Sequence, residues 1–505
     1  MGAVADGFPA PLAVGNWLRH PARHRPWHPA IISEGRSVDY ATLDAWSDRL
    51  ARVLVGRGLR PGERVATLSE NSVEQVVLLF ACARAGLILA PLNWHLSQDE
   101  LAVQLELFEP ALTLIAASRW SEQAGGVAAR WQPEPLEDYV TDAYPASGTS
   151  LPAVDDDAGL LLIATSGTTG VPKGALLTNR NCYWTNASLQ AAVPLGADDV
   201  VLALLPQYHV GGWNIQTLLA WSLGATVVLE RAFDPGRVLD LVERHHVTTL
   251  MGVPTMYVLV AEHPRFAEAD LSSLRFALVG GAAMPAAVRE RWSGRGVAMA
   301  IGYGLTEAGP NTLVLRPDEP SRWPGAVGHP YPYVEVALRD PTDGRVLEGP
   351  GTGEILVRGP NVFAGYWHDP VATRAAVVEG WLRTGDVGER DAEGSYRISG
   401  RTKEMYISGG ENVYPAEIER VLSEHPAVAD VAVIGVPDPV WGEVGVAYVV
   451  TRHDAAVSVD ELEAHCRSHL ARYKVPRHIL ITPELPRSPV GKIDKRHLSR
   501  DVDTR

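Results

Sequence analysis

Residues 165–174 combine the residue types that bind phosphate groups. They follow an apolar run at 160–164 and contain hydroxyl side chains, glycines and one lysine. Glycines let a backbone approach an anion closely, hydroxyls donate hydrogen bonds, and Lys173 adds a positive charge. The Gly-Lys-Ser/Thr ending of a Walker loop is absent, and Pro172 offers no backbone amide before the lysine. The segment therefore predicts a phosphate-binding loop of another kind, with a flexible surface turn as the alternative.

A second segment, residues 302–307, puts a hydroxyl and a carboxylate side by side after the apolar strand expected at 297–301. Mg²⁺ binds through one or two carboxylates together with phosphates, and this chemistry suits Glu307. Thr306 can donate a hydrogen bond to a phosphate oxygen, and Tyr303 offers a flat ring for a base. The alternative is a glycine-rich turn around a core tyrosine.

Two more residues and one segment indicate a function only when they are considered together with the two segments above. Asp386 ends a glycine-rich turn, where an acidic side chain accepts hydrogen bonds from ribose hydroxyls or simply caps the turn. Residues 400–415 hold cations that could meet phosphate, followed by the pair Gly409 and Gly410, which leaves room for a narrow ligand. Near the end of the chain, Lys492 stands beside a glycine in a polar segment, where most lysines are only solvated.

Helix-like and strand-like patterns alternate along the first part of the chain and must position these residues. Apolar residues recur at helical spacing over 43–54 and stop at Gly56, and 76–91 is expected to be a buried helix running into a strand. The alternation comprises strand 63–68, strand 200–205, helix 216–223, strand 226–229, helix 238–245, strand 248–251 and strand 276–279. Such repetition predicts parallel sheets with helices on both faces and ligands beyond the carboxyl ends of the strands.

The pattern changes after about residue 325. Alternating residues at 334–338 and 354–358 predict antiparallel strands of a small barrel-like β unit that closes the large domain. A new compact block follows, with helices at 415–422 and 460–470 and strands at 428–434 and 444–450. We therefore expect an α/β protein with a large N-terminal domain (1–402) and a small α+β C-terminal domain (403–505).

The composition excludes several classes of protein. The 60 acidic and 45 basic residues give a net charge of −15 without a basic run, so nucleic acid is not an expected partner. The N-terminus has no signal-peptide pattern, and the apolar run at 76–91 contains an arginine, a glycine and a proline, so no membrane span is expected. Cys82, Cys182 and Cys466 are too few and scattered for a disulfide framework, which favours the cytoplasm.

The order, residue types and separations of these segments resemble the adenylate-forming superfamily of acyl-CoA synthetases, adenylation domains and beetle luciferases. The resemblance covers essentially the whole chain. Within that superfamily the sequence is similar to carboxylate–CoA ligases of the fatty-acyl, aryl or cyclohexanecarboxylate type. Two positions depart from the usual pattern, because Glu404 stands where aspartate is commoner and Tyr208 precedes His209 where phenylalanine is usual.

The resemblance implies a role for each segment. It implies that ATP is bound by hydroxyl, glycine, aromatic and charged residues, namely Thr165, Ser166, Gly167, Thr168, Thr169, Gly170, Lys173, Gly281, Ala282, Tyr303, Asp386 and Arg401. The implied catalytic residues are Lys492, Thr306, Glu307 and His209, with Glu307 also holding Mg²⁺. The implied acyl pocket consists of Tyr208, His209, Gly211, Trp213, Gly280, Gly302 and Gly304. Coenzyme A is expected at Gly409, Gly410, Trp441 and Lys474, with the hinge between domains at Lys403.

The activity implied by the resemblance has two steps. A carboxylic acid attacks the α-phosphate of ATP to give an acyl-adenylate and pyrophosphate, with Lys492 offsetting the developing charge. The C-terminal domain then swings about Lys403, which brings Gly409 and Gly410 to the tunnel through which the CoA thiol displaces AMP. The bulk of Trp213 favours a medium-chain, cyclic or aromatic acid, and a homodimer is a possible assembly.

Two alternatives stay open from the sequence. In the first, the same adenylation serves another acceptor, such as a carrier protein, an amine or a small inorganic nucleophile. In the second, the chain is a catalytically silent nucleotide-binding regulator. The second alternative requires lost catalytic side chains, whereas this sequence keeps the full set: Lys173, Thr306, Glu307, Asp386, Arg401 and Lys492.

Overall fold

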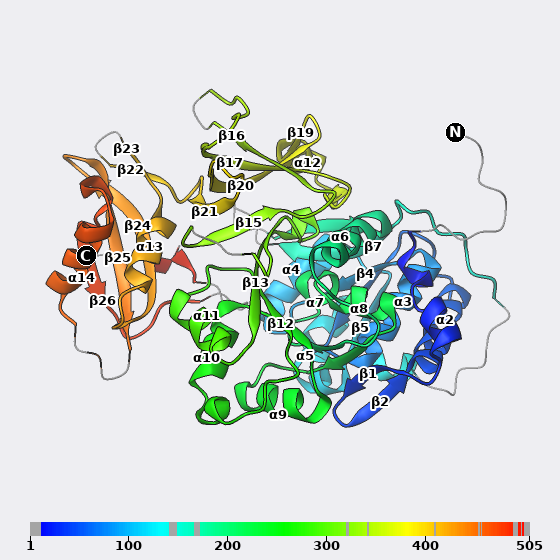
Figure 1. Ribbon diagram of the computed structural model, residues 1–505. Coiled ribbons are helices and arrows are strands. Elements are labelled where there is room, and N and C mark those ends of the chain that lie inside the picture. Colours follow the sequence, from blue (N-terminus) through cyan, green and yellow to red (C-terminus); the bar gives the residue numbers. More distant parts are fainter. Residues whose placement is uncertain are drawn as a thin grey trace.

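The computed structural model describes residues 12–140, 149–165, 172–319, 323–340, 343–408, 411–452, 455, 457–487, 493–495 and 497–498. Within these residues the chain forms a large α/β part, with a smaller C-terminal part beside it (Figure 1). No helix in these ranges combines the length and the apolar character that crossing a membrane requires.

The largest sheet has 14 strands in the described part of the chain. Its parallel section runs β1, β10, β9, β11, β12 and β13, which confirms the predicted parallel strands. Antiparallel strands continue the same sheet beyond β13 and form the β unit expected after residue 325. The order across the sheet is β16 (Glu335–Arg339), β17 (Gly351–Arg358), β20 (Trp381–Arg390), β21 (Tyr396–Arg401), β15 (Ala326–Pro330), β14 (Leu313–Leu315), β13 (Ala298–Tyr303), β12 (Phe276–Val279), β11 (Thr249–Gly252), β9 (Val200–Ala203), β10 (Thr226–Leu229), β1 (Pro29–Ser33) and β2 (Arg36–Asp39), with β19 (Val377–Val378) beside β20.

The second sheet has seven strands among the described residues. Strands β3, β4, β5 and β7 pair in parallel, and β7 turns back into the antiparallel strand β8. Its order is β18 (Gly365–Tyr366), β8 (Lys173–Thr178), β7 (Gly159–Thr165), β4 (Ile88–Pro91), β3 (Arg64–Leu68), β5 (Leu112–Ile115) and β6 (Glu134–Pro135). Strand β18 comes from a distant part of the sequence and adds to the edge at β8.

Helices cover the sheets because successive strand residues face opposite sides and both faces are apolar. On β3, Val65 packs in the cluster that contains helix α3, whereas its neighbour Ala66 packs in the cluster that contains helix α4. The α-helices of the large part are α1 (Arg19–His24), α2 (Tyr40–Gly56), α3 (Val73–Ala85), α4 (Gln98–Phe108), α5 (Ala117–Trp131), α6 (Asn179–Ala192), α7 (Gly211–Asn214), α8 (Thr217–Leu223), α9 (Pro235–His245), α10 (Pro254–Glu262), α11 (Ala286–Ser293) and α12 (Pro370–Ala376).

Local sequence explains where the early helices begin and end. Asp39 caps the N-terminus of helix α2, because its carboxylate accepts a hydrogen bond from the Thr42 backbone amide. Helix α3 is capped by Ser72 before its first residue and by Gly86 after its last, and Gly86 takes a left-handed conformation with φ +70° that suits glycine. Because α3 is apolar on nearly all sides, it is buried along its whole length, as expected for the run at 76–91.

The C-terminal part has a sheet of five strands in its described residues and hydrophobic clusters of its own. Its strands are β23 (Glu411–Val413), β22 (Tyr406–Ser408), β25 (Gly442–Thr451), β24 (Val428–Asp438) and β26 (His478–Ile481), with helices α13 (Pro415–Ser423) and α14 (Val459–His469). An ion pair of 3.5 Å between Arg452 and Glu262 links this part to helix α10. The separate core supports the predicted division into two domains, and the boundary after residue 402 stays a prediction.

Candidate active site

The β7–β8 hairpin carries the predicted phosphate loop. Thr165 and Lys173 are its last paired residues, and the Thr165 hydroxyl donates a hydrogen bond of 3.4 Å to the Lys173 carbonyl. The hairpin therefore holds both ends of the loop side by side. Five of the predicted ATP-binding residues lie outside the described residues: Ser166, Gly167, Thr168, Thr169 and Gly170.

Lys173 and Glu307 are brought together by Tyr366, a residue that the sequence analysis missed. The Lys173 ammonium lies 4.9 Å from the centroid of the Tyr366 ring. The Tyr366 hydroxyl donates a hydrogen bond of 2.8 Å to Glu307 Oε1. Burial and the Glu307 carboxylate raise the pKa of Tyr366, so this hydroxyl stays protonated and remains a donor. The signal was weak in the sequence, because Tyr366 belongs to a two-residue strand that only the tertiary fold pairs with β8.

Thr306 and Glu307 stand at the start of a short 3₁₀ helix, η4 (Thr306–Ala308), directly beyond β13. Both are half-buried, and the Glu307 carbonyl accepts a hydrogen bond of 2.9 Å from the Phe363 amide. That backbone bond ties η4 to the segment that leads into Tyr366. Glu307 therefore sits at the carboxyl end of a parallel strand, where α/β sheets bind ligands.

Tyr303, Asp386 and Arg401 form a second cluster next to the first. The Tyr303 hydroxyl donates a hydrogen bond of 2.6 Å to Asp386 Oδ2, and Arg401 Nε lies 3.0 Å from Asp386 Oδ1. Asp386 and Arg401 are direct partners in the β20–β21 pairing, which fixes their separation. Burial first, and then the Asp386 carboxylate, raise the pKa of Tyr303 well above its ordinary value. The Arg401 side chain is 58% exposed, so its cation also reaches solvent.

Glycines make close approaches along the strand ends near these clusters. A Cβ on Gly304 would stand 1.4 Å from the Pro310 carbonyl oxygen, so no side chain fits there. A Cβ on Gly280 would come within 3.3 Å of the Gly302 carbonyl oxygen, which brings the ends of β12 and β13 together. Gly281 has φ +84°, a conformation that favours glycine, and Ala282 beside it is exposed.

Tyr208 and His209 lie in the loop after β9, beyond the carboxyl end of a parallel strand, where ligands of such sheets are expected. Their ring centroids are 5.0 Å apart, and the His95 ring stands edge-on to Tyr208 at 6.3 Å. Gly211 begins helix α7 in the same loop. The three rings form an aromatic wall. Tyr208 and His209 were predicted from the sequence, and His95 was not.

Trp213 differs from the sequence expectation. It has no accessible surface, and its indole N–H donates a hydrogen bond of 2.6 Å to the Gln207 carbonyl. A side chain that packs wholly within the core lines no open cavity, so Trp213 supports the loop before it and does not itself shorten an acyl pocket. The physical reason is local, because the indole turns back toward its own loop to satisfy a buried carbonyl.

The predicted CoA and hinge residues lie in or next to the C-terminal part. Lys403 is exposed, and Trp441 is 47% exposed at the turn between β24 and β25. Lys474 Nζ bonds both Glu417 oxygens at 2.8 and 2.7 Å, so its charge is already neutralised, contrary to its expected availability for a CoA phosphate. Gly409, Gly410 and Lys492 lie outside the described residues.

A partly buried ion cluster that the sequence did not suggest lies beside the predicted hinge residue, Lys403. Lys495 Nζ lies 2.7 Å from Glu404 Oε2 and 2.8 Å from Glu419 Oε1. Glu404 follows Lys403 directly, and Lys495 is three positions after Lys492. The ammonium therefore ties the residue after the predicted hinge to helix α13 and to the part of the chain near Lys492.

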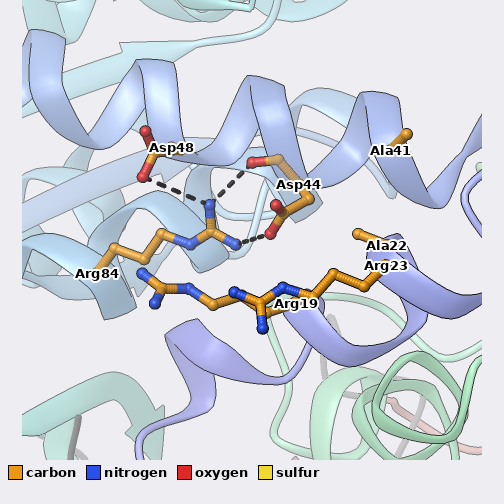
Figure 2. A pocket seen from close by; sticks show the side chains of 7 residues that line it. All are labelled: Arg19, Ala22, Arg23, Ala41, Asp44, Asp48 and Arg84. Carbon is orange, nitrogen blue, oxygen red and sulfur yellow. Dashed lines mark hydrogen bonds and ion pairs between the residues drawn. The ribbon is translucent and has the colours of Figure 1, made fainter. Parts of the chain in front are cut away.

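A separate cavity of about 320 Å³ lies far from these clusters, among helices α1, α2 and α3 (Figure 2). Arg84 lies deep in it, where it forms an ion pair with Asp44 and lies 3.9 Å from Asp48. Helix α2 is at the opposite end of the molecule from the C-terminal sheet (Figure 1). The cavity therefore takes no part in the candidate active site.

Comparisons with known proteins identify the family to which the chain belongs. The family described as AMP-binding enzyme matches residues 18–367, and the AMP-binding enzyme C-terminal domain matches residues 417–492. A feruloyl-CoA synthase of an Amycolatopsis species is 42% identical over 96% of this chain and 98% of its own. An indoleacetate–CoA ligase of Aromatoleum aromaticum is 37% identical over 96% of this chain and 97% of its own.

A solved structure gives the same result for the fold. The o-succinylbenzoate CoA synthetase of Bacillus subtilis, in complex with its acyl-adenylate intermediate, superimposes with a TM-score of 0.86. It is 34% identical and covers 96% of this chain and 97% of its own. The same enzyme with ATP and magnesium ion superimposes with a TM-score of 0.87 at 33% identity.

Proposed function

The chain belongs to the family of AMP-binding enzymes, and from this premise we propose how its residues join a carboxylic acid to coenzyme A. The enzyme is an AMP-forming acid–CoA ligase that uses ATP, Mg²⁺ and CoA and passes through an acyl-adenylate. The observation that carries the proposal is the attachment of two clusters to the segment 303–307: Lys173 and Tyr366 at Glu307, and Asp386 and Arg401 at Tyr303.

The first cluster is the triphosphate end of the site in this proposal. Lys173 and the hydroxyls and amides of residues 165–170 bind the β- and γ-phosphates, and Thr306 donates to a phosphate oxygen. The Tyr366 ring beneath the Lys173 ammonium limits the directions that the lysine can take. Fixed cations and donors stabilise the charge that builds on the phosphates as pyrophosphate leaves.

Glu307 fits the chemistry of a magnesium ligand. Its Oε1 accepts the Tyr366 hydroxyl, which leaves Oε2 and the second lone pair of Oε1 for an ion. No group of three acidic, histidine or cysteine side chains that could hold a metal occurs among the described residues. A single carboxylate suits Mg²⁺, which keeps several waters and otherwise binds the substrate phosphates. When bound, Mg²⁺ neutralises phosphate charge, and Tyr366 orients the carboxylate that holds it.

The second cluster is the nucleoside end. Asp386 accepts hydrogen bonds from the ribose hydroxyls, and Arg401 balances its charge. Tyr303 places its ring against the adenine while its hydroxyl is held by Asp386. Gly280, Gly281 and Ala282 provide backbone close to the base. The Asp386 carboxylate bonds both the Tyr303 side chain, which stacks on the adenine, and the ribose hydroxyls. It therefore positions the base and the sugar together.

The acyl transfer is assigned to the C-terminal domain. An acid oxygen attacks the α-phosphorus while Lys492 offsets the charge, and the bond to pyrophosphate breaks. The domain then turns about Lys403, Lys492 withdraws, and Gly409 and Gly410 line the path of the thiol past His209. The sulfur attacks the acyl carbonyl, and AMP leaves. Trp441 is the CoA contact that stays in the proposal, since Lys474 is paired with Glu417.

The acid is proposed to be medium-chain, cyclic or aromatic. The support comes from the wall of Tyr208, His209 and His95 and from the two relatives named for feruloyl and indoleacetate substrates. A cytoplasmic location is supported by the free, buried state of Cys82, Cys182 and Cys466. A homodimer is part of the same proposal and is tested by the mass of the purified protein in solution.

The proposed function is tested by measuring pyrophosphate release from purified protein with ATP, Mg²⁺ and a panel of carboxylic acids. Lys492→Ala should nearly abolish adenylate formation and keep CoA transfer from supplied acyl-AMP, whereas Gly409→Leu should do the reverse. Replacing CoA by an amine or a carrier protein identifies the acceptor. Equal loss of both half-reactions in either variant contradicts the assigned role, and no acyl-adenylate from any acid contradicts the function.

A further inference from the structure

Gly302 borders a small space that is surrounded by oxygen atoms. A Cβ built on Gly302 would meet, as its three nearest atoms, the Val279 carbonyl oxygen at 3.7 Å, the Leu313 carbonyl oxygen at 3.8 Å and the Tyr331 hydroxyl at 4.0 Å. These are ordinary van der Waals distances, so the missing side chain leaves room that a ligand atom can use. Gly302 is half-buried, so the space is reachable from solvent.

The Tyr331 hydroxyl has no hydrogen-bond partner among the residues that the structure describes. The residue is 3% exposed and packs in the main hydrophobic cluster. Its backbone amide donates to the Thr312 carbonyl and its backbone carbonyl accepts from the Val334 amide, so both main-chain groups are paired and the hydroxyl is not. A buried tyrosine hydroxyl usually has a partner, because leaving it unpaired loses the hydrogen bonds it makes in water. The Tyr331 oxygen is not among the fully enclosed side-chain atoms that lack a partner, so it reaches the space beside it, where water or a ligand group can pair with it. Burial raises the pKa of Tyr331, so the group remains a neutral hydroxyl that donates and accepts.

The space beside Gly302 lies at the wall that the proposed function assigns to the acyl group of the substrate. Gly302 precedes Tyr303 on β13, and Ala300, two residues earlier, points to the same face and packs in the same cluster as Tyr331. Gly280, another glycine assigned to the acyl pocket, approaches the Gly302 carbonyl oxygen from β12. The space therefore opens at the wall that the proposed function gives to the acyl group.

The kind of ligand follows from the three oxygens. Two are carbonyl oxygens, which only accept hydrogen bonds, and the third is a hydroxyl, which does both. An aliphatic hydrogen leaves the Tyr331 hydroxyl unpaired, and a second carboxylate sets negative charge against oxygen atoms. A hydroxyl group suits this set, because it can donate to one of the carbonyl oxygens while it accepts from Tyr331.

We propose that the Tyr331 hydroxyl and the space at Gly302 select acids that carry a hydroxyl on the part of the acyl group lying against Gly302. This inference rests on the proposed function, because it needs the acyl group to occupy that wall. It makes Tyr331 a specificity-determining residue that binds substrate, and it narrows the substrate class from aromatic and cyclic acids to their hydroxylated members.

The test compares cinnamate with its 2-, 3- and 4-hydroxy derivatives and with 4-carboxycinnamate as substrates for pyrophosphate release. Wild type should prefer at least one hydroxy acid over cinnamate by about tenfold or more in kcat/KM and should disfavour the dicarboxylate. Tyr331→Phe should reduce that preference to nearly one. Gly302→Ala fills the space without a strained φ, so it should reduce the preference as well.

Tyr257→Phe is the matched control. Its hydroxyl is also buried and donates a bond of 2.6 Å to the Leu278 carbonyl, and it is not one of the three atoms nearest to a Cβ on Gly302, so this variant should lose stability and keep the preference. A wild-type preference that survives in both Tyr331→Phe and Gly302→Ala overturns the inference, as does equal use of all the acids by wild type. If no acid is adenylated by wild type, the proposed function fails instead. Melting curves of each variant separate an altered preference from a failure to fold.

Discussion

Tyr366→Phe should weaken the binding of Mg²⁺ while leaving an aromatic ring at position 366. The substitution removes the hydroxyl that donates to Glu307 Oε1 at 2.8 Å, and it keeps the aromatic face 4.9 Å from the Lys173 ammonium. A hydrogen bond to a charged group contributes about 1.5 to 3 kcal/mol. Because both side chains are half-buried, solvent replaces part of this, and the lower value of about 1.5 kcal/mol applies. That free energy corresponds to about a tenfold lower affinity for Mg²⁺, which is at the lower end of the affinity loss seen when a residue that orients a metal ligand is removed.

The measurement is pyrophosphate release at saturating ATP and acid while Mg²⁺ is varied. The Mg²⁺ concentration for half-maximal rate should rise about tenfold in Tyr366→Phe, and most of the rate should return at high Mg²⁺. A second readout without turnover is the rise in melting temperature that ATP gives at each Mg²⁺ concentration, which should shift in the same way.

Two further variants make the result specific. Tyr396→Phe removes a hydroxyl that donates 3.1 Å to the Val336 carbonyl in the antiparallel section, so it should leave the Mg²⁺ dependence unchanged. Tyr366→Ala also removes the ring under Lys173, so it should in addition raise the KM for ATP by a factor of about two to five. An unchanged Mg²⁺ midpoint in Tyr366→Phe refutes the idea that this hydroxyl orients Glu307.

Three other predictions concern the nucleoside end, the glycines and the hinge. Asp386→Asn should raise the KM for ATP about 10- to 100-fold, because it weakens bonds to Tyr303, Arg401 and ribose; an unchanged KM excludes the ribose assignment. Gly304→Ala should unfold the protein or lower its melting temperature sharply, because the added Cβ would lie 1.4 Å from the Pro310 carbonyl oxygen. Gly196→Ala is the control and should leave the melting temperature nearly unchanged, because no atom lies within 4 Å of its added Cβ. Similar melting temperatures for the two variants contradict the predicted clash. Burial opposes the charge of Lys495, but Glu419 and Glu404 raise its pKa above the ordinary 10.5, so its stabilisation is present below pH 10.5 and is lost as the pH rises through the folded pKa. Melting temperatures between pH 9 and 12 should therefore fall more steeply in wild type than in Lys495→Met, and parallel curves contradict this role.

Much of the fold could be predicted because its elements are coded locally. The apolar periodicity of 43–54 with its glycine stop matches helix α2, and the run at 76–91 matches α3 and β4. The strand predictions at 226–229 and 276–279 match β10 and β12 residue for residue. Caps, periodicity and glycine stops lie within a few residues of one another, so a sequence window contains the whole signal.

The candidate site could be predicted only in part. Thr165, Lys173, Glu307 and Asp386 stand out because glycines and turn residues surround them, and the structure brings Lys173 close to Glu307 through Tyr366. Tyr366 itself belongs to a two-residue strand whose partner, β8, is almost two hundred positions earlier in the chain, so no local pattern marks it.

Side-chain direction is what the sequence left open. Trp213 suggested a pocket wall by its bulk, yet its indole turns into the core to bond the Gln207 carbonyl. Lys474 suggested a phosphate contact by its charge, yet Glu417, far away in the chain, neutralises it. Both outcomes depend on which partner comes within hydrogen-bond distance after folding.

The amino-acid sequence by itself determined the parallel sheets, the order of the motifs and the chemical types available for nucleotide binding, because those properties belong to short stretches of chain. Only the tertiary structure decided that Tyr366 joins Lys173 to Glu307, that Lys495 ties Glu404 to Glu419, and that the Tyr331 hydroxyl is left unpaired beside Gly302 within the described residues. The reason is that hydrogen bonds and ion pairs act over a few ångströms, and the residues concerned come within that distance only when strands and loops from distant parts of the sequence are packed together.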